Sequence, residues 1–138
     1  FIMVLGAPHF GQAKSFYEDN FAVSIGIDVT TAQPVKAEAL GLPATDEHRM
    51  LTFVLAGGQE VAAKIQLDEH PKRASVRPRR AGDLPGGVAL VTFEVPSFER
   101  LALPFVQPPR PFDYPPYDGR LVATCVGGAG ELIELAAR

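Results

Sequence analysis

Four polar side chains stand at alternate positions inside otherwise apolar stretches. Lys64 and Gln66 lie in AKIQL, Thr92 lies in LVTFEV, and Glu134 lies in the closing LIEL. Side chains along a strand point to opposite faces in turn, so each of these groups shares a face with its alternate neighbours. A few polar groups among aliphatic ones are typical of a pocket that orients a small organic molecule. Glu134 is the candidate catalytic group, a base if a substrate brings an acidic proton within reach.

A purely structural role is the alternative for these four residues. In that case Gln66 and Glu134 hydrogen-bond to each other or to Lys64, or the long Lys64 side chain reaches solvent.

The other reactive side chains are less suited to chemistry. Cys125 is the only cysteine and lies in the apolar run LVATCV, which favours a buried core thiol over a nucleophile. His9, His48 and His70 are scattered without the spacing of a helical metal site, and we expect each at the surface. The basic segment 72–80 is a solvated linker, with binding of a phosphate or carboxylate tail as the alternative.

Hydrophobic periodicity predicts the elements that position these residues. In the first half we expect an amphipathic helix at 11–22 and strands at 1–5, 23–31, 49–55 and 61–68. We also expect a loop that includes one helical turn over 35–48, and a hairpin turn at Gly57-Gly58. The second half repeats this order. We expect strands at 88–95, 120–126 and 131–136, and an edge strand or extended loop over 106–117. A short helix over 97–103 follows the first of these strands, with Ser97 as its cap.

The repeat predicts an α+β fold built as a single domain from two βαβββ modules. Module one covers 1–70, a linker covers 71–87, and module two covers 88–138. Each sheet has one face for a helix and another that is free to curve around a cup. Alternation places the following ligand-binding residues on the wall of that cup: Ile2, Val4, Lys64, Gln66, Leu90, Thr92, Leu132 and Glu134.

Three stretches carry a resemblance to a known family: AKSFYEDNFA, GGVALVTFEV and GRLVATCVGGAGELIEL. Together they resemble the vicinal oxygen chelate superfamily, which includes glyoxalase I, extradiol dioxygenases, methylmalonyl-CoA epimerase and bleomycin-resistance proteins. The resemblance extends over essentially the whole chain. It implies a cupped, mostly antiparallel mixed sheet with helices on the convex face, and it implies a homodimer.

The resemblance also implies where a divalent metal would bind. The four positions, on the first and last strands of each half, correspond to Ile2, Gln66, Leu90 and Glu134. Because a divalent ion needs three or more N or O side-chain donors, two aliphatic residues leave too few. We therefore predict no metal and no cofactor, with Gln66 and Glu134 as vestigial positions.

Composition excludes several classes of partner. The formal charge is −3, with 46% hydrophobic and 21% charged residues, which argues against nucleic acid as a partner. No apolar run approaches the roughly 20 residues of a membrane span. A single cysteine fits a reducing compartment, so we expect a cytoplasmic protein.

Three functions remain open at this point. The first is metal-independent binding of an apolar or aromatic small molecule. The second is a metal-dependent lyase, isomerase or dioxygenase like the enzymes of the superfamily. The third is a degenerate module of a longer two-domain enzyme.

Overall fold

The chain divides into two compact units. The structure is a computed structural model that describes residues 2–55, 63–69, 71, 78 and 80–138. The first unit is Phe1–Pro78 and the second is Arg79–Arg138.

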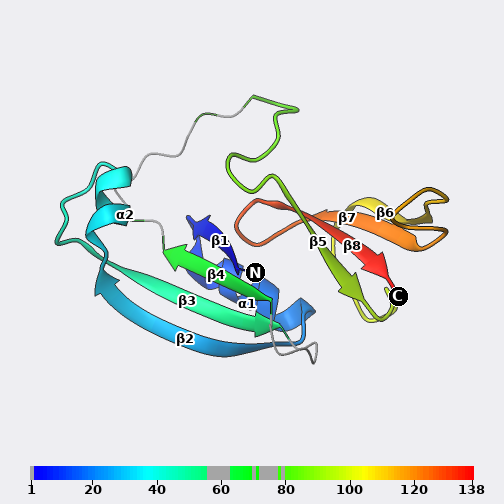
Figure 1. Cartoon of the computed structure of the whole chain (residues 1–138), viewed down its shortest axis with the longest axis horizontal. Helices are drawn as coiled ribbons and strands as arrows, with labels where there is room; N and C mark the ends of the chain where they lie inside the picture. The colour runs from blue at the N-terminus through cyan, green and yellow to red at the C-terminus, as the bar shows by residue number, and fades with distance from the viewer. Residues whose placement is uncertain (1, 56–62, 70, 72–77, 79) are drawn as a thin grey trace. The chain divides into compact units, whose positions relative to one another are not determined.

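The first unit has a mixed sheet of four strands in the order β1-β4-β3-β2 (Figure 1). Strand β1 runs parallel to β4, whereas β3 is antiparallel to both β4 and β2. Its elements are β1 (Ile2–Ala7), α1 (Phe10–Asn20), β2 (Val23–Ala32), α2 (Pro34–Ala39), β3 (Glu47–Leu55) and β4 (Lys64–Glu69).

Helix α1 packs on one face of this sheet, as its amphipathic pattern predicts. Tyr17 is fully buried, and its ring lies 6.0 Å from the ring of Phe53 on β3. The helix ends where Phe21 turns extended while its N–H donates to the carbonyl of Tyr17. The side chains buried on this face of the sheet are Met3, Leu5, Ala7, Leu51, Phe53, Ile65 and Leu67.

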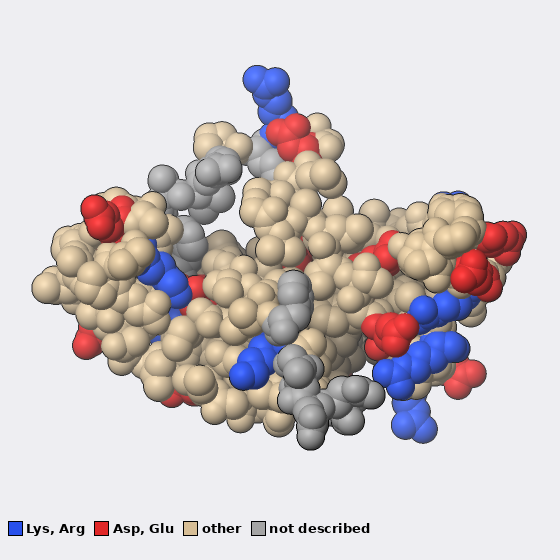
Figure 2. Space-filling model, in the orientation of Figure 1, with Lys and Arg blue, Asp and Glu red and all other residues tan. Residues whose placement is uncertain are grey.

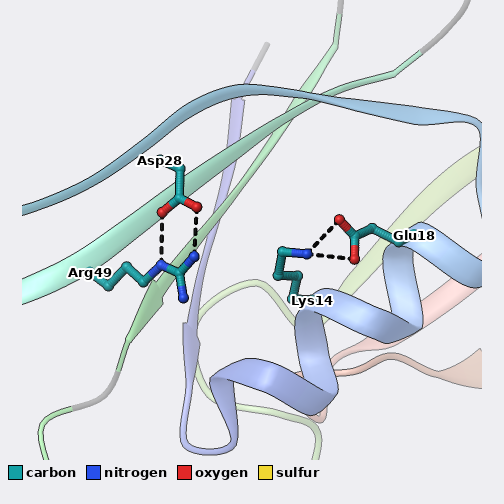
Figure 3. Close-up of polar contacts among 4 residues, drawn as sticks. All are labelled: Lys14, Glu18, Asp28 and Arg49. Carbon is teal, nitrogen blue, oxygen red and sulfur yellow. Dashed lines mark hydrogen bonds and ion pairs between the residues drawn. The ribbon is translucent and has the colours of Figure 1, made fainter.

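Two ion pairs lie beside this core (Figure 3). Arg49 donates from Nε and Nη2 to the two carboxylate oxygens of Asp28, at 2.7 and 2.6 Å, which ties β3 to β2. These hydrogen bonds lower the pKa of the Asp28 carboxyl. The Arg49 guanidinium also lies 4.9 Å from the centre of the Phe10 ring at the start of α1. Lys14 and Glu18 pair one turn apart along α1.

The second unit repeats the topology of the first. Its elements are β5 (Leu90–Val95), β6 (Phe105–Pro111), β7 (Leu121–Val126) and β8 (Leu132–Ala137), in the order β5-β8-β7-β6. Strand β5 runs parallel to β8, and the other pairs are antiparallel. The predicted α+β fold with repeated modules is therefore confirmed, and β6 is an edge strand as its prolines indicate.

The helix predicted over 97–103 is wrong. The segment makes a single turn, in which the Leu101 N–H donates to the carbonyl of Phe98. Pro104 disfavours helical geometry in Leu103, which shortens any helix in this segment, and such short helices form only where tertiary packing supports them. The segment still contributes to the core, because Leu103 is buried and the Phe98 and Phe105 rings meet edge to face at 6.0 Å.

One predicted loop contains a short helix, and parts of two other predicted segments lie outside the described residues. The helical turn expected within 35–48 is the short helix α2 over Pro34–Ala39, which begins at Pro34, a position that favours proline. The turn at Gly57-Gly58 and the linker residues 70, 72–77 and 79 lie outside the described residues. In the described part of the chain, no helix is long and apolar enough to cross a membrane.

Replacing Phe53 by Ala should destabilise the first unit by about 3–5 kcal/mol, because it leaves a cavity under Tyr17. Urea unfolding followed by circular dichroism measures the loss. The matched control is Val35→Ala on α2, where the side chain is 83% exposed and the change should stay within about 0.5 kcal/mol. Equal effects of the two substitutions would contradict the position of Phe53 in the core.

Candidate functional site: the open faces of the two sheets

The face of the first sheet opposite α1 carries four of the predicted site residues. Ile2 is opposite Lys64, and Val4 is opposite Gln66, in the parallel ladder of β1 and β4. Ile2 and Val4 are 46% and 45% exposed, whereas Met3 and Leu5 between them are buried. The faces assigned by alternation are thus the observed ones. Ligand binding by these residues stays a prediction.

The amide of Gln66 is oriented by a chain of polar contacts along this face. Gln66 donates from Nε2 to Oδ1 of Asp68 at 2.8 Å, and Lys36 on α2 donates to Oδ2 of the same carboxylate at 2.6 Å. Asp68 is only 8% exposed, so its charge depends on these partners. The bonds considered from sequence, to Glu134 or Lys64, are not the ones that Gln66 makes. Its carbonyl oxygen accepts no hydrogen bond from the described residues.

Sequence reasoning missed Lys36 and Asp68. Asp68 follows Gln66 at the alternate position of β4, so the same period-two argument places it on this face. Lys36 had no such signal, because only the fold brings α2 to the end of β4.

His48 is buried, contrary to the prediction of a surface position. It is 5% exposed, and its Nε2 finds no hydrogen-bond partner in the described part of the chain. It lies on β3 opposite Thr31, where the chain turns from β2 into α2. His9 is exposed as predicted, and His70 lies outside the described residues.

The open face of the second sheet carries the other four site residues in two rows across the strands. Leu90, Leu132 and Val126 are opposite one another on β5, β8 and β7, and form an apolar row. Two residues further along, Thr92, Glu134 and Thr124 form a polar row. Leu90 is 49% exposed and Val126 is 44% exposed, so the apolar row faces outward.

Two hydroxyl groups orient the carboxylate of Glu134. Thr92 donates from Oγ1 to Glu134 Oε1 at 2.9 Å, and the Tyr117 hydroxyl donates to the same oxygen at 2.7 Å. The hydrogen bond to Glu134 raises the pKa of Tyr117, so Tyr117 keeps its proton at neutral pH and acts as a donor. From the sequence, Tyr117 is only the last residue of the edge strand or extended loop expected over 106–117, without this partner.

Tyr117 belongs to a cluster of three aromatic rings. The Phe112, Tyr114 and Tyr117 rings lie 5.4–6.3 Å apart, with interplanar angles of 55–79°. Arg110 adds its guanidinium 4.7 Å from the centre of the Phe112 ring. Because the rings hold one another, the loop between β6 and β7 presents the Tyr117 hydroxyl to Glu134 in a fixed direction.

A third row ends this side of the sheet, where Ala136 and Val122 are buried and Glu94 is exposed. Glu94, Ala136 and Val122 are opposite one another, and Arg120 reaches across β8 to bond Glu94 at 2.9 Å while also donating to the Ala137 carbonyl at 2.6 Å. Arg138 lies 3.6 Å from Glu94. In the view of Figure 2, acidic and basic side chains are intermixed at this end of the second unit. The Glu94 charge is therefore neutralised within the unit.

The buried Cys125 thiol takes no part in these faces. It lies opposite Phe105 and Ile133 on the core side of the second sheet. Burial and then the nearby Glu131 raise its pKa to about 11, so it is a protonated core thiol at neutral pH. This agrees with the structural role predicted from its apolar surroundings.

The residues present do not fit a divalent metal at the four family positions. Ile2 and Leu90 have no donor atom, and the Gln66 amide and the Glu134 carboxylate are already hydrogen-bonded within their own units. Among residues 2–55, 63–69 and 80–138, no group of three or more His, Cys, Asp or Glu is arranged to hold a metal ion.

Comparison with known proteins identifies the fold. No family model matches the chain, and no curated protein sequence matches it. Among solved structures, a glyoxalase family protein from Bacillus cereus aligns with a TM-score of 0.71 and 16% identity over 98% of this chain and 90% of that chain. Glyoxalase I from Zea mays aligns with a TM-score of 0.65 and 11% identity over 99% of this chain, which spans only 44% of the maize chain.

A third similar structure is the fosfomycin resistance protein FosX from Listeria monocytogenes, complexed with Mn(II) and 1S,2S-dihydroxypropylphosphonic acid. It aligns with a TM-score of 0.56 and 16% identity over 99% of this chain and 88% of that chain. The chain therefore has the fold of the vicinal oxygen chelate superfamily, as its sequence resemblance implied. At such low identity this likeness concerns the fold alone.

The contact between Tyr117 and Glu134 predicts an alkaline titration that depends on the carboxylate. The pKa of Tyr117 is raised in the folded protein. The protonated Tyr117 side chain therefore contributes its full stabilisation of the fold below the ordinary tyrosine pKa, and this stabilisation is lost as the pH rises through the pKa of Tyr117 in the folded protein. The difference in phenolate absorbance between the wild type and Tyr117→Phe isolates this group. Glu134→Gln should return its pKa toward the ordinary value. An unchanged titration in Glu134→Gln would show that the two side chains do not interact.

The donor count predicts weak metal binding. Elemental analysis of protein purified without chelator should find well under one divalent ion per chain, because Gln66 and Glu134 leave most of a coordination shell to water. Stoichiometric Zn, Fe, Mn or Ni that survives dialysis would overturn the assignment of Ile2 and Leu90 to the family positions.

Proposed function

We propose that this chain binds an apolar or aromatic small molecule on the open faces of its sheets, without a metal. The observation that carries the proposal is the apolar row of Leu90, Leu132 and Val126, which lies beside one oriented carboxylate on the second sheet. Exposed aliphatic side chains in register supply area for an apolar ligand, and a single fixed polar group supplies orientation. The exposed Ile2 and Val4 on the first sheet support the same role.

The arrangement favours binding over metal-dependent catalysis. Glu134 already accepts two hydrogen bonds through one oxygen. The metal position that the family resemblance implies on β5 is occupied by Leu90, which has no donor atom. An apolar ligand would gain about 25 cal/mol for each Å² of apolar surface buried, before the cost of association. The cytoplasmic location and the homodimer expected from the sequence belong to this proposal as predictions.

Replacing Leu90 by Arg should abolish binding, because it inserts a charge into the apolar row while leaving the buried side of β5 unchanged. A thermal-shift screen against aromatic metabolites and hydrophobic antibiotics finds ligands for the wild type, and the same compounds are then tested on the variant. The shift should fall to the level of noise.

The matched control for this variant is Val106→Arg. Val106 is 65% exposed on β6, the opposite edge strand of the same sheet, and the substitution adds the same charge. It should leave ligand binding intact. If Leu90→Arg binds the compounds as tightly as Val106→Arg does, the open face is not the binding site.

A further inference from the structure

The open face of the second unit holds two carboxylates with very different surroundings. Glu94 lies within 2.9 Å of one arginine and 3.6 Å of another, so its charge is balanced. Glu134 receives hydrogen bonds from two neutral hydroxyls, and it takes part in none of the ion pairs among the described residues. Hydroxyl donors orient a carboxylate without cancelling its charge. Glu134 thus leaves a negative charge on this face.

Both hydroxyls bind the same oxygen of Glu134. Thr92 and Tyr117 donate to Oε1, and no described residue donates to Oε2. The pair therefore fixes the direction of the carboxylate while leaving the second oxygen available as an acceptor. Tyr117 stays protonated at neutral pH and cannot add a second anion at this point.

The apolar row lies at a fixed separation from this acceptor. Leu132 and Glu134 are alternate residues of β8, so the two rows are ~7 Å apart along the strand. Leu90 and Val126 extend the apolar row to either side of Leu132, and both are exposed. A ligand that satisfies both rows has a flat apolar group joined through two or three bonds to a hydrogen-bond donor.

From this we infer that the open face of the second unit selects a protonated amine carried on an apolar or aromatic body, with Glu134 Oε2 accepting from the ammonium. This inference rests on the proposed function and gives the chemical class of its ligand. An amine matches the uncancelled charge, an alcohol offers a donor without charge, and a carboxylate is repelled. Tyr117 is a positioning residue, because it holds the carboxylate in place.

Three probes that share one ring system test the inference: 2-(1-naphthyl)ethylamine, 2-(1-naphthyl)ethanol and the carboxylate of 1-naphthylacetic acid. The sequence contains no tryptophan, so the naphthalene fluorescence can be followed against a background of tyrosine alone. Titration at low ionic strength should give an affinity for the amine about three- to tenfold above that for the alcohol, with the carboxylate weakest. Added salt should weaken binding of the amine and leave that of the alcohol unchanged.

Glu134→Gln should bring the affinity for the amine down to that for the alcohol. Glu99→Gln, in the turn between β5 and β6, changes the net charge equally and should keep the preference for the amine. If the three probes bind equally, if the carboxylate binds best, or if Glu134→Gln keeps the preference, the inference is overturned while the proposed function stands. If no naphthalene probe binds the folded wild type, both fail. If a variant does not fold, the salt dependence of amine binding by the wild type still tests the inference.

Discussion

Both units depend on the parallel pairing of their first and last strands. In each sheet the strand that begins the unit lies beside the strand that ends it, so residues far apart in the sequence share one row: Ile2 with Lys64, and Leu90 with Leu132. A shift of one residue in either ladder would exchange the buried and open faces. The buried residues Ile65 and Ile133 hold these registers, because they have to reach the core.

On the open faces, polar side chains hydrogen-bond to one another within each unit. In the first unit the acceptor is Asp68, which receives bonds from Gln66 and Lys36. In the second unit the acceptor is Glu134, which receives bonds from Thr92 and Tyr117. The two positions that correspond in the repeat, Gln66 and Glu134, thus play opposite parts, since one donates and the other accepts. The repeated backbone carries two different chemistries.

The two units also differ in what covers their sheets. The first has the helix α1, whose Tyr17 ring packs against the Phe53 ring with the two planes tilted by 44°. In the second, an irregular segment places Leu103 in the core, and the loop that carries Tyr117 reaches the open face. The segment between Pro96 and Pro104 is short, and Pro104 disfavours helical geometry in Leu103, so its apolar side chains pack without regular hydrogen bonding.

The sequence by itself determined the order of the strands along the chain, the repeat of that order in the two halves, and the two faces of β1, β4, β5 and β8. These features follow from the local periodicity of apolar residues, and the tertiary contacts agree with it. Met3 and Leu5 are buried while Ile2 and Val4 are exposed, as alternation along a strand requires. Only the tertiary structure decided which polar groups meet. Tyr117 and Glu134 are 17 residues apart, and Lys36 and Asp68 are 32 apart. The burial of His48 was equally hidden, because the packing around a side chain depends on distant segments that leave no periodic trace in its own strand.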